Sequence, residues 1–517
     1  MINKFRKNRN KIITFFLISL LFKPLWLFNN QNLGEPADDM SHWLHSATIA
    51  FDRDLIYVND YEIQSQIFNP ETNVPSHPPG AGYLASPFVF IFSLLDKITE
   101  NPSTYSRVNP AKSFAFLGFF FAGIFYTYFG TSLIVSVVKK YKNKNTGLIL
   151  LCGLLSTLVH FVTTRFLMPH AAEFFLCCFL IYLFEKNNKT KFNTFDTTQL
   201  IFIYFWLAIT RPSTFLYSLI LIGLYRKKFS LDAKSLIISS VQFIGFSSLY
   251  VLVSRKLYQE NYMLLNTYGR DSEEYVASFN FEQILNGIIK LPNLFISPNM
   301  GIIFSTPIIF LGLLFFFNKY LKDNIVNSNK LYLFLYLGAS VLPLLVWQGR
   351  EVAYGQRLLI GIIPMCIVIT CKYLKDRSFI LLTKFLTLFT YLGYLFYYSS
   401  EKMTLRKGTT LWGTDVGFTA ENYYIEMLKG LTDFESIISV LLRNIYIVDL
   451  LKFFNFRNFI SNTSLVDMFG PEKFDKFLSF ADGYFNLSLS YLFVANLIII
   501  LFSYFYTRLI FSSSKNN

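Results

Sequence analysis

Long apolar runs recur from one end of the chain to the other, and they constrain its fold more than any other feature. A hydrocarbon core of about 30 Å needs roughly 20 apolar residues per helix. About twelve runs suit this length, at about 12–28, 113–138, 146–162, 170–185, 198–210, 213–225, 235–254, 300–317, 331–347, 358–372, 378–398 and 488–507. Only 15% of the residues are charged, against about 25% in a typical soluble domain, so the chain lacks the charge to cover soluble surfaces. We therefore expect an all-α polytopic membrane protein with about twelve transmembrane helices.

The distribution of charge predicts how these helices are oriented. With the N-terminus in the cytoplasm, the cytoplasmic segments hold 24 Lys/Arg and 5 Asp/Glu, whereas the long outward segments 29–112, 255–299 and 399–487 hold 17 and 26. This asymmetry follows the positive-inside rule. It requires that a further apolar stretch at 80–95 does not cross, so we predict an interfacial helix there. The net charge of +14 is then a consequence of topology, and nucleic-acid binding is not expected.

The same reading divides the chain into three parts. We expect a transmembrane core over 1–398 that includes the first outward loop, 29–112. A small, mostly helical outward domain follows over 399–487, and the last span and a cytoplasmic tail occupy 488–517. The predicted location is the bacterial inner (cell) membrane, with many passes. Within the core, the two short runs on either side of Arg211-Pro212 predict a tight hairpin.

The first outward loop begins with an acidic pair, Asp38 and Asp39. The apolar spacing of Met40–Phe51 predicts a helix that lies flat on the membrane, with one of the two carboxylates as its N-cap. The functional alternative is a carboxylate pair at the membrane surface, in which one carboxylate deprotonates an acceptor hydroxyl and the other orients it or binds a cation. His42 and His45 share a face of this helix, either as its polar rim or as metal ligands beside the aspartates.

Farther along the same loop, His77 precedes Pro78-Pro79 and the segment Gly80–Gly82. The prolines hold the backbone extended, and the glycines allow close approach by a headgroup or by a neighbouring helix. His77 is a candidate donor to a phosphate. The alternative is a helix that starts with proline in its first turn.

Four arginines lie at predicted outward ends of spans, where the positive-inside rule disfavours them. They are Arg165, Arg211, Arg350 and Arg357. Because a guanidinium binds phosphate oxygens through a planar fork, all four are candidate phosphate ligands, with Arg211 and Arg357 preferred. Snorkelling to the headgroups or pairing with Glu173 or Glu351 is the alternative. His42, His170 and Tyr354 are the further side chains expected to line a substrate cavity, although His170 also suits a hydrogen-bonded structural role. Ser305-Thr306-Pro307 predicts a broken helix start that either lines this cavity or acts as a structural cap.

The combination of these segments resembles the GT-C membrane glycosyltransferases, which use sugars linked to polyprenyl phosphate. The families it resembles most are the protein O-mannosyltransferases, the lipid A aminoarabinose transferases and the Rgt-type transferases, together with bacterial family-39-like relatives. The likeness covers roughly residues 10–375 and is clearest over 34–90. Further segments similar to bacterial members are RFLMPHAAEFF (165–175), TRPS (210–213), LFISPNMGIIFSTPI (294–308) and WQGREVAYGQRLLIGIIPM (347–365).

This resemblance implies an activity and roles for individual residues. It implies that Asp38 is the base or acceptor organiser, with Asp39 at a position where relatives often have Glu. His77-Pro78-Pro79 matches the His-Pro-Pro of the mannosyltransferases, whereas the following Gly-Ala-Gly departs from their Leu-Gly-Lys, so the substrate is not implied to be the same. The expected function is transfer of a sugar from a polyprenyl-phosphate donor to a lipid, glycan or protein acceptor on the outward face.

Two other functions suit a polytopic chain. A transporter or flippase would show repeats or charged spans near the midplane, and neither is evident. A glycan polymerase or ligase would rely on a late loop with Arg and His, whereas all five histidines precede residue 171. No cofactor is certain. A divalent cation is possible, but adjacent aspartates on a helix diverge by about 100°, so we expect no metal site and catalysis that is independent of added metal.

Overall fold

The structure is a computed structural model, and its described residues belong to two compact units. It describes residues 2–22, 37–57, 68–69, 74–75, 77–100, 113–163, 165–185, 191–229, 233–258, 285, 288–289, 292, 295, 301–320, 328–343, 356–399 and 489–512. One unit is formed by 33–387 and 512–517, and the other by 1–32 and 388–511. Arg350, Tyr354 and all but the first residue of the predicted outward domain at 399–487 lie outside the described residues.

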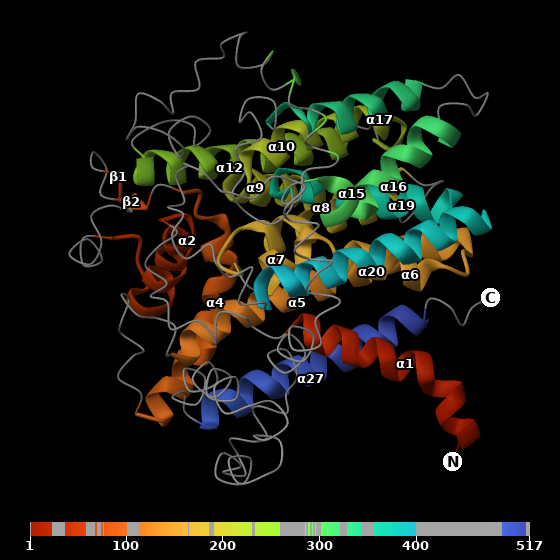
Figure 1. Cartoon of the computed structure of the whole chain (residues 1–517). Helices are drawn as coiled ribbons and strands as arrows, with labels where there is room; N and C mark the ends of the chain where they lie inside the picture. The colour runs from red at the N-terminus through yellow and green to blue at the C-terminus, as the bar shows by residue number, and fades with distance from the viewer. Residues whose placement is uncertain are drawn as a thin grey trace, which may run out of the picture. The chain divides into compact units, whose positions relative to one another are not determined.

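Almost all described residues of the larger unit are helical (Figure 1). The first outward loop forms α2 (Ala37–Ala47), η2 (Thr48–Asp52), β1 (Phe68–Asn69), β2 (Val74–Pro75) and α4 (Gly80–Ile98), with β1 and β2 paired antiparallel. The following elements are α5 (Phe114–Val138), η5 (Lys139–Tyr141), α6 (Thr146–Leu154), α7 (Thr157–Thr163), α8 (His170–Glu185), α9 (Thr194–Thr210), α10 (Pro212–Ser218), α11 (Ile220–Leu224), η6 (Arg226–Lys228), α12 (Ala233–Tyr258), α15 (Ile302–Ser305), α16 (Pro307–Phe315), η7 (Phe316–Tyr320), α17 (Ser328–Ala339), η8 (Arg357–Ile362), α19 (Ile363–Tyr373) and α20 (Arg377–Ser399), the last of which continues into the smaller unit. In the smaller unit, α1 (Ile2–Leu21) lies beside α27 (Leu489–Ser512), and the ring centroids of Phe22 and Tyr506 are 5.0 Å apart.

Several of these helices suit a membrane. Among the described residues, Gly80–Ile98, Phe114–Tyr141, Leu236–Tyr258 and Phe493–Ser512 are long and apolar enough to cross one. The pair α6–α7, bent by 56°, would be a fifth if it forms a single span. These helices confirm the expectation of an all-α membrane protein. A helix or a broken pair covers at least part of each predicted run, but the number of twelve spans stays a prediction.

The helix α4 coincides with the stretch expected to lie at the interface. Its length and hydropathy would also allow it to cross a membrane. It runs antiparallel to α5 and packs on the first half of that helix, where Phe88 and Phe92 contact Phe121 with ring centroids 5.5 Å apart in each case. The buried carboxylate of Asp96 accepts hydrogen bonds from the first two amides of α5, each at 2.8 Å. This bond pattern compensates the unpaired donors at a helix N-terminus. The interfacial placement of 80–95 stays a prediction.

The hairpin expected at Arg211-Pro212 is present. The helix α9 starts with a capping box between Asn193 and Asp196, and it ends at Thr210. Arg211 leaves the helical conformation (φ −149°, ψ 85°), as the steric demand of a following proline requires, and Pro212 opens α10. The chain then folds back, so that the Tyr204 hydroxyl donates to the Ser218 carbonyl at 2.9 Å.

The break expected at Ser305-Thr306-Pro307 is also present. Thr306 separates α15 from α16 with φ −143° and ψ 57°. Its hydroxyl lies 2.6 Å from that of Thr157, the first residue of α7, and both side chains are buried. Irregular backbone at membrane depth requires partners inside the protein, and α7 provides one here. Thr306 makes no side-chain cap bond to α16, so its bond to Thr157 joins two helices, and the two predicted roles of this break both stay predictions.

One expectation about the first loop is wrong. Residues 39–48 of α2 and η2 are all buried, so the protein covers α2 on every side and its apolar stripe does not rest on a membrane. Trp43 packs edge-to-face on Phe116 of α5 at 5.4 Å. The helix also begins at Ala37, which places Asp38 and Asp39 in its first turn instead of at its N-cap.

The glycines of the first loop serve helix packing. A Cβ on Gly82 would lie 2.5 Å from the His42 carbonyl oxygen and 2.6 Å from the His45 Cβ. A Cβ on Gly80 would collide with Thr210 at the end of α9. Of the two predicted uses, close approach by neighbouring helices is therefore the one that the structure shows, and it brings α2, α4 and the α9–α10 hairpin together.

Candidate functional site

Ends of helices that are distant in the sequence meet around His170, the first residue of α8. The positive charges of Arg165, Arg211 and Arg357 all act on its imidazole, and so does His42. Arg165 precedes α8, Arg211 is the apex of the α9–α10 hairpin, and Arg357 starts η8. We call this group of side chains, together with Asp39 and Glu173, the arginine cluster. It gathers three of the four arginines singled out in the sequence, and the fourth, Arg350, lies outside the described residues.

The acidic pair of the first loop contributes one described carboxylate to the cluster. Asp39 forms an ion pair with Arg165 through two bonds, from Nε at 2.9 Å and from Nη2 at 2.5 Å to the same Oδ2. The Asp39 side chain is 5% exposed and that of Arg165 is 17% exposed, so water screens the pair little. The contact ties α2 to the turn before α8. For Asp38 the structure gives the backbone in α2 but does not describe the side chain.

The histidines of the first loop separate into two roles. The rings of His42 and His77 meet edge-to-face at 5.7 Å, and the His77 Nδ1 lies 3.4 Å from the Ser41 hydroxyl. His45 turns away from this pair. Its Nε2 lies 2.8 Å from the His77 carbonyl oxygen and its Nδ1 lies 2.7 Å from the Tyr57 hydroxyl.

His45 therefore has a structural role. Its two bonds assign the Nε2–H tautomer, in which Nδ1 accepts from Tyr57. Burial lowers the pKa of His45 to about 3 and raises the pKa of Tyr57 well above its ordinary value, because a buried site disfavours charge. The Tyr258 hydroxyl at the end of α12 donates to the same His77 carbonyl at 2.7 Å. Together these bonds fix the segment that carries His77.

A buried carboxylate, Glu173, lies at the centre of the cluster. Its Oε2 accepts from the His170 Nδ1 at 2.8 Å, and its Oε1 accepts from the Thr214 hydroxyl at 2.5 Å. The backbone of Gly361 packs against it, since a Cβ on Gly361 would lie 3.1 Å from Oε1, and the charge of Arg211 acts on it. His170 is thus hydrogen-bonded, as one of its two predicted roles required.

Sequence reasoning missed the importance of Glu173, Thr214 and Gly361. Glu173 was considered only as an alternative partner for an arginine. A carboxylate within the apolar run of α8 is costly unless hydrogen bonds compensate it. This cost is the feature of the sequence that indicates several hydrogen-bond partners for Glu173. Nothing in the local pattern could have identified Thr214 or Gly361 as its partners.

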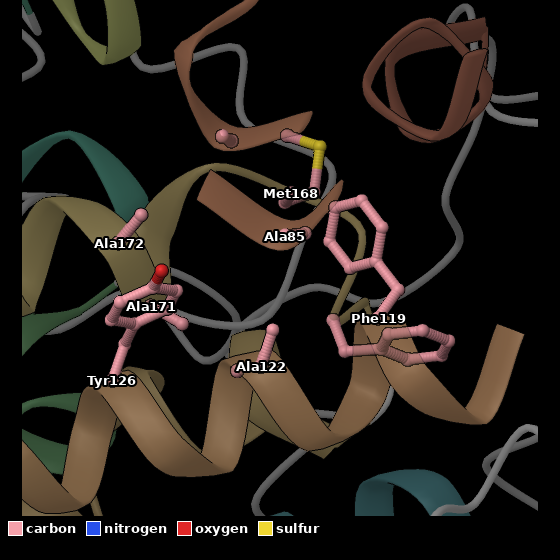
Figure 2. A pocket seen from close by; sticks show the side chains of 10 residues that line it. Ala85, Phe119, Ala122, Tyr126, Met168, Ala171 and Ala172 are labelled. Atoms are coloured by element: carbon pink, nitrogen blue, oxygen red, sulfur yellow. The ribbon is translucent and has the colours of Figure 1, made fainter. Parts of the chain in front are cut away.

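A small apolar crevice lies beside the cluster (Figure 2). Phe119, Ala122 and Tyr126, spaced along one face of α5, form one wall, and Met168 and Ala171 approach from the start of α8. The Tyr126 hydroxyl donates to the Leu84 carbonyl in α4 at 2.8 Å. The Sδ of Met168, which lines the crevice, lies 3.8 Å from the Nη2 of Arg165, so an apolar group in the crevice would lie near that charge.

The residues that the structure describes contain no group of three or more His, Cys, Asp or Glu placed to hold a metal ion. The proposed pair of His42 and His45 does not point to one common site, because His45 uses both ring nitrogens within the protein. Metal dependence stays a prediction. Comparisons of the chain with protein-family models, curated proteins and solved structures gave no match.

Proposed function

We propose that the protein is an integral-membrane glycosyltransferase that moves a sugar from a polyprenyl-phosphate donor to a lipid, glycan or protein acceptor. The observation that carries the proposal is the arginine cluster. Its described members contribute three guanidinium groups and two carboxyl groups. Even with both carboxyls ionised, positive charge is in excess, which favours an anionic ligand at a buried place.

The chemistry of the donor suits such a site. The acceptor oxygen attacks the anomeric carbon, the bond from that carbon to the phosphate oxygen breaks, and polyprenyl monophosphate leaves. The acceptor's proton passes to a carboxylate, for which Asp38 is the candidate. The donor phosphodiester carries one negative charge, and a second develops as the bond breaks. Guanidinium groups therefore bind the transition state more tightly than the donor, which is the condition for catalysis.

The residues of the site have different proposed roles, some toward the donor phosphate and others toward the first loop and the substrate cavity. Arg211 and Arg357 are the proposed phosphate ligands. Asp39 and Arg165 form one ion pair, so we assign Arg165 to hold the first loop in place as well as to contribute charge. His42 and His77 lie next to each other in the same loop, where His77 is a further candidate donor to the phosphate and His42 would line the substrate cavity. The membrane places the polyprenyl tail beside the helices, and the full proposal includes about twelve spans, a cytoplasmic N-terminus and a bacterial inner membrane.

The test is chemical conversion of the donor. The purified protein is reconstituted in vesicles with a panel of polyprenyl-phosphate sugars and an envelope fraction as the acceptor, and release of polyprenyl monophosphate is measured. The wild type is expected to release it from at least one donor, and Asp38→Asn is expected to reduce release by at least about hundredfold. Movement of intact donor across the bilayer without bond cleavage would favour a flippase instead. Undiminished release by Asp38→Asn would remove that residue as the base.

A further inference from the structure

Glu173 connects three elements that are far apart in the sequence. It lies in the first turn of α8 and is fully buried. Its carboxylate accepts from His170 in its own helix and from Thr214 in α10, and it packs against the backbone of Gly361 in η8. Because a buried carboxylate is stable only with hydrogen bonds, these two donors and the carboxylate hold one another in a defined geometry, with Gly361 packed against them.

Two of the partners lie close in sequence to the proposed phosphate ligands. Thr214 is in the first turn of α10, and the amide of Phe215 donates to the carbonyl of Arg211 at 3.0 Å. Fixing Thr214 therefore fixes the backbone of Arg211. Gly361 lies about one turn after Arg357 in η8, so its close packing against Glu173 and Tyr217 restricts the turn that carries Arg357.

The packing around Gly361 leaves room only for a glycine. A Cβ there would collide with the Tyr217 hydroxyl and would lie 3.1 Å from the Oε1 of Glu173. The Tyr217 hydroxyl in turn donates to Thr214 at 3.3 Å, and the Tyr336 hydroxyl donates to the Gly361 carbonyl at 3.3 Å. Both sides of the carboxylate are thus enclosed by groups that restrict its movement.

We propose that Glu173 is the positioning residue of the phosphate site, which holds Arg211 through α10 and Arg357 through η8 so that both guanidiniums meet one phosphate group. This deepens the proposed function and rests on it. The residue acts through the two arginines and does not itself touch the substrate. A like charge beside an incoming phosphate is unfavourable, so the benefit of Glu173 must lie in geometry.

An effect through charge and an effect through geometry therefore predict opposite changes in phosphate binding when Glu173 is replaced. Glu173→Gln removes a negative charge near Arg211. If the carboxylate acted only through its charge, the change would strengthen phosphate binding. If it positions the arginines, the amide replaces one of the two acceptor oxygens by a donor, so one of the bonds from His170 and Thr214 is disturbed and phosphate binding weakens.

The measurement uses the full protein in nanodiscs, polyprenyl monophosphate as the probe and polyprenol, which lacks the phosphate, as the reference. The dissociation constant of polyprenol divided by that of polyprenyl monophosphate isolates the contribution of the phosphate, and a larger ratio means that the phosphate binds more strongly. Glu173→Gln is expected to reduce this ratio by about tenfold, the effect of losing one charge-assisted hydrogen bond. A ratio that is unchanged or larger would overturn the proposal.

A second pair of variants keeps the test decisive if Glu173→Gln does not fold. Thr214→Val keeps the shape of the side chain and removes the hydroxyl donor, whereas Thr214→Ser keeps the donor. The proposal expects a weaker phosphate contribution in Thr214→Val and near wild-type values in Thr214→Ser. Equal values for the two variants would contradict it.

Asp96 supplies the matched control, because it is an equally buried carboxylate that accepts two amide bonds at the start of α5. Asp96→Asn is expected to lower stability and leave the ratio unchanged. A reduction as large as that of Glu173→Gln would show a general effect of destabilisation and overturn the proposal. If wild-type protein binds the two lipids equally, the proposed function fails instead, so the two failures are distinguishable.

Discussion

Among the described residues of the larger unit, the helix breaks at Arg211-Pro212 and at Thr306-Pro307 both precede a proline, and their backbones are nearly alike. Arg211 has φ −149° and ψ 85°, and Thr306 has φ −143° and ψ 57°. Both side chains are buried. They differ in what they bring to the interior, because one break places a guanidinium there and the other a neutral hydroxyl.

The surroundings of the two breaks differ accordingly. The hydroxyl of Thr306 lies 2.6 Å from that of Thr157, and this hydrogen bond joins two helices. Arg211 acts on His170 and Glu173, and further charged groups converge on the same place. A proline break in a membrane helix is therefore uninformative by itself. The charge of the residue before the proline, and what it costs to bury, distinguishes a structural break from a functional one.

The largest expected effect comes from exchanging the charge at the functional break. Arg211→Met keeps an unbranched apolar side chain and removes the guanidinium. We expect turnover of the polyprenyl-phosphate sugar to fall by at least about hundredfold, because a group that stabilises developing charge typically contributes this much. Arg211→Lys should recover part of the loss, since it keeps the charge but not the fork. Initial rates at saturating donor give the comparison, and equal rates for Arg211→Met and the wild type would contradict the account.

The next effect concerns the ion pair that joins the first loop to the cluster. Asp39→Asn and Arg165→Met each leave one charge without its partner at a nearly buried place. We expect each to cost about 2–3 kcal/mol of stability, and the double variant to cost less than the sum of the two. Thermal unfolding in detergent measures all four proteins. Strict additivity would show that the pair contributes no coupling.

A smaller effect is expected at the structural break. Thr306→Val removes the bond to Thr157 while keeping the shape of the side chain. The loss of one neutral hydrogen bond costs about 1 kcal/mol, and turnover should stay at the wild-type level. Unfolding temperature and initial rate are measured on the same preparation. A loss of turnover comparable to that of Arg211→Met would remove the distinction between the two breaks.

The smallest effect concerns His45, which supports the first loop without belonging to the arginine cluster. Its pKa is lowered to about 3 by burial, against an ordinary value of about 6.5, so between these values only the unfolded chain binds the proton. Its contribution to stability is full above about pH 6.5 and declines as the pH falls. Between pH 7 and 5.5 the expected loss is about 1 kcal/mol.

The variant His45→Gln isolates this contribution from that of other titrating groups. The amide can still donate to the His77 carbonyl but does not titrate. The fall in unfolding temperature between pH 7 and 5.5 should therefore be smaller in the variant by about 1–2 °C. Identical pH dependence in the two proteins would show that His45 is not held neutral.

Local patterns predicted most of the helices and both breaks. The apolar runs, the steric effect of proline and the unexpected arginines all act within one or two turns, so they are visible in the sequence. The hairpin at Arg211 and the interruption at Thr306 follow from the same rule for the residue before a proline.

Long-range pairing could not be predicted in this way. Asp39 and Arg165 are 126 positions apart, and no local pattern records which carboxylate a given arginine meets. The interfacial interpretation of α2 failed for a similar reason. An amphipathic stripe shows that a face must be covered, but it does not show whether lipid or protein covers it. Glu173 is visible as a carboxylate in an apolar run, yet its contacts with Thr214 in α10 and Gly361 in η8 arise only because the fold brings these elements together.

The central claim is that the break at Arg211-Pro212 presents a phosphate ligand together with Arg357. The most direct test is an electron cryomicroscopy structure of the protein in nanodiscs with polyprenyl monophosphate bound. The account predicts phosphate density within about 4 Å of the guanidinium groups of both Arg211 and Arg357, with the carboxylate of Glu173 still bonded to Thr214. Phosphate density at another place in the protein, with the arginine cluster unchanged and empty, would contradict it.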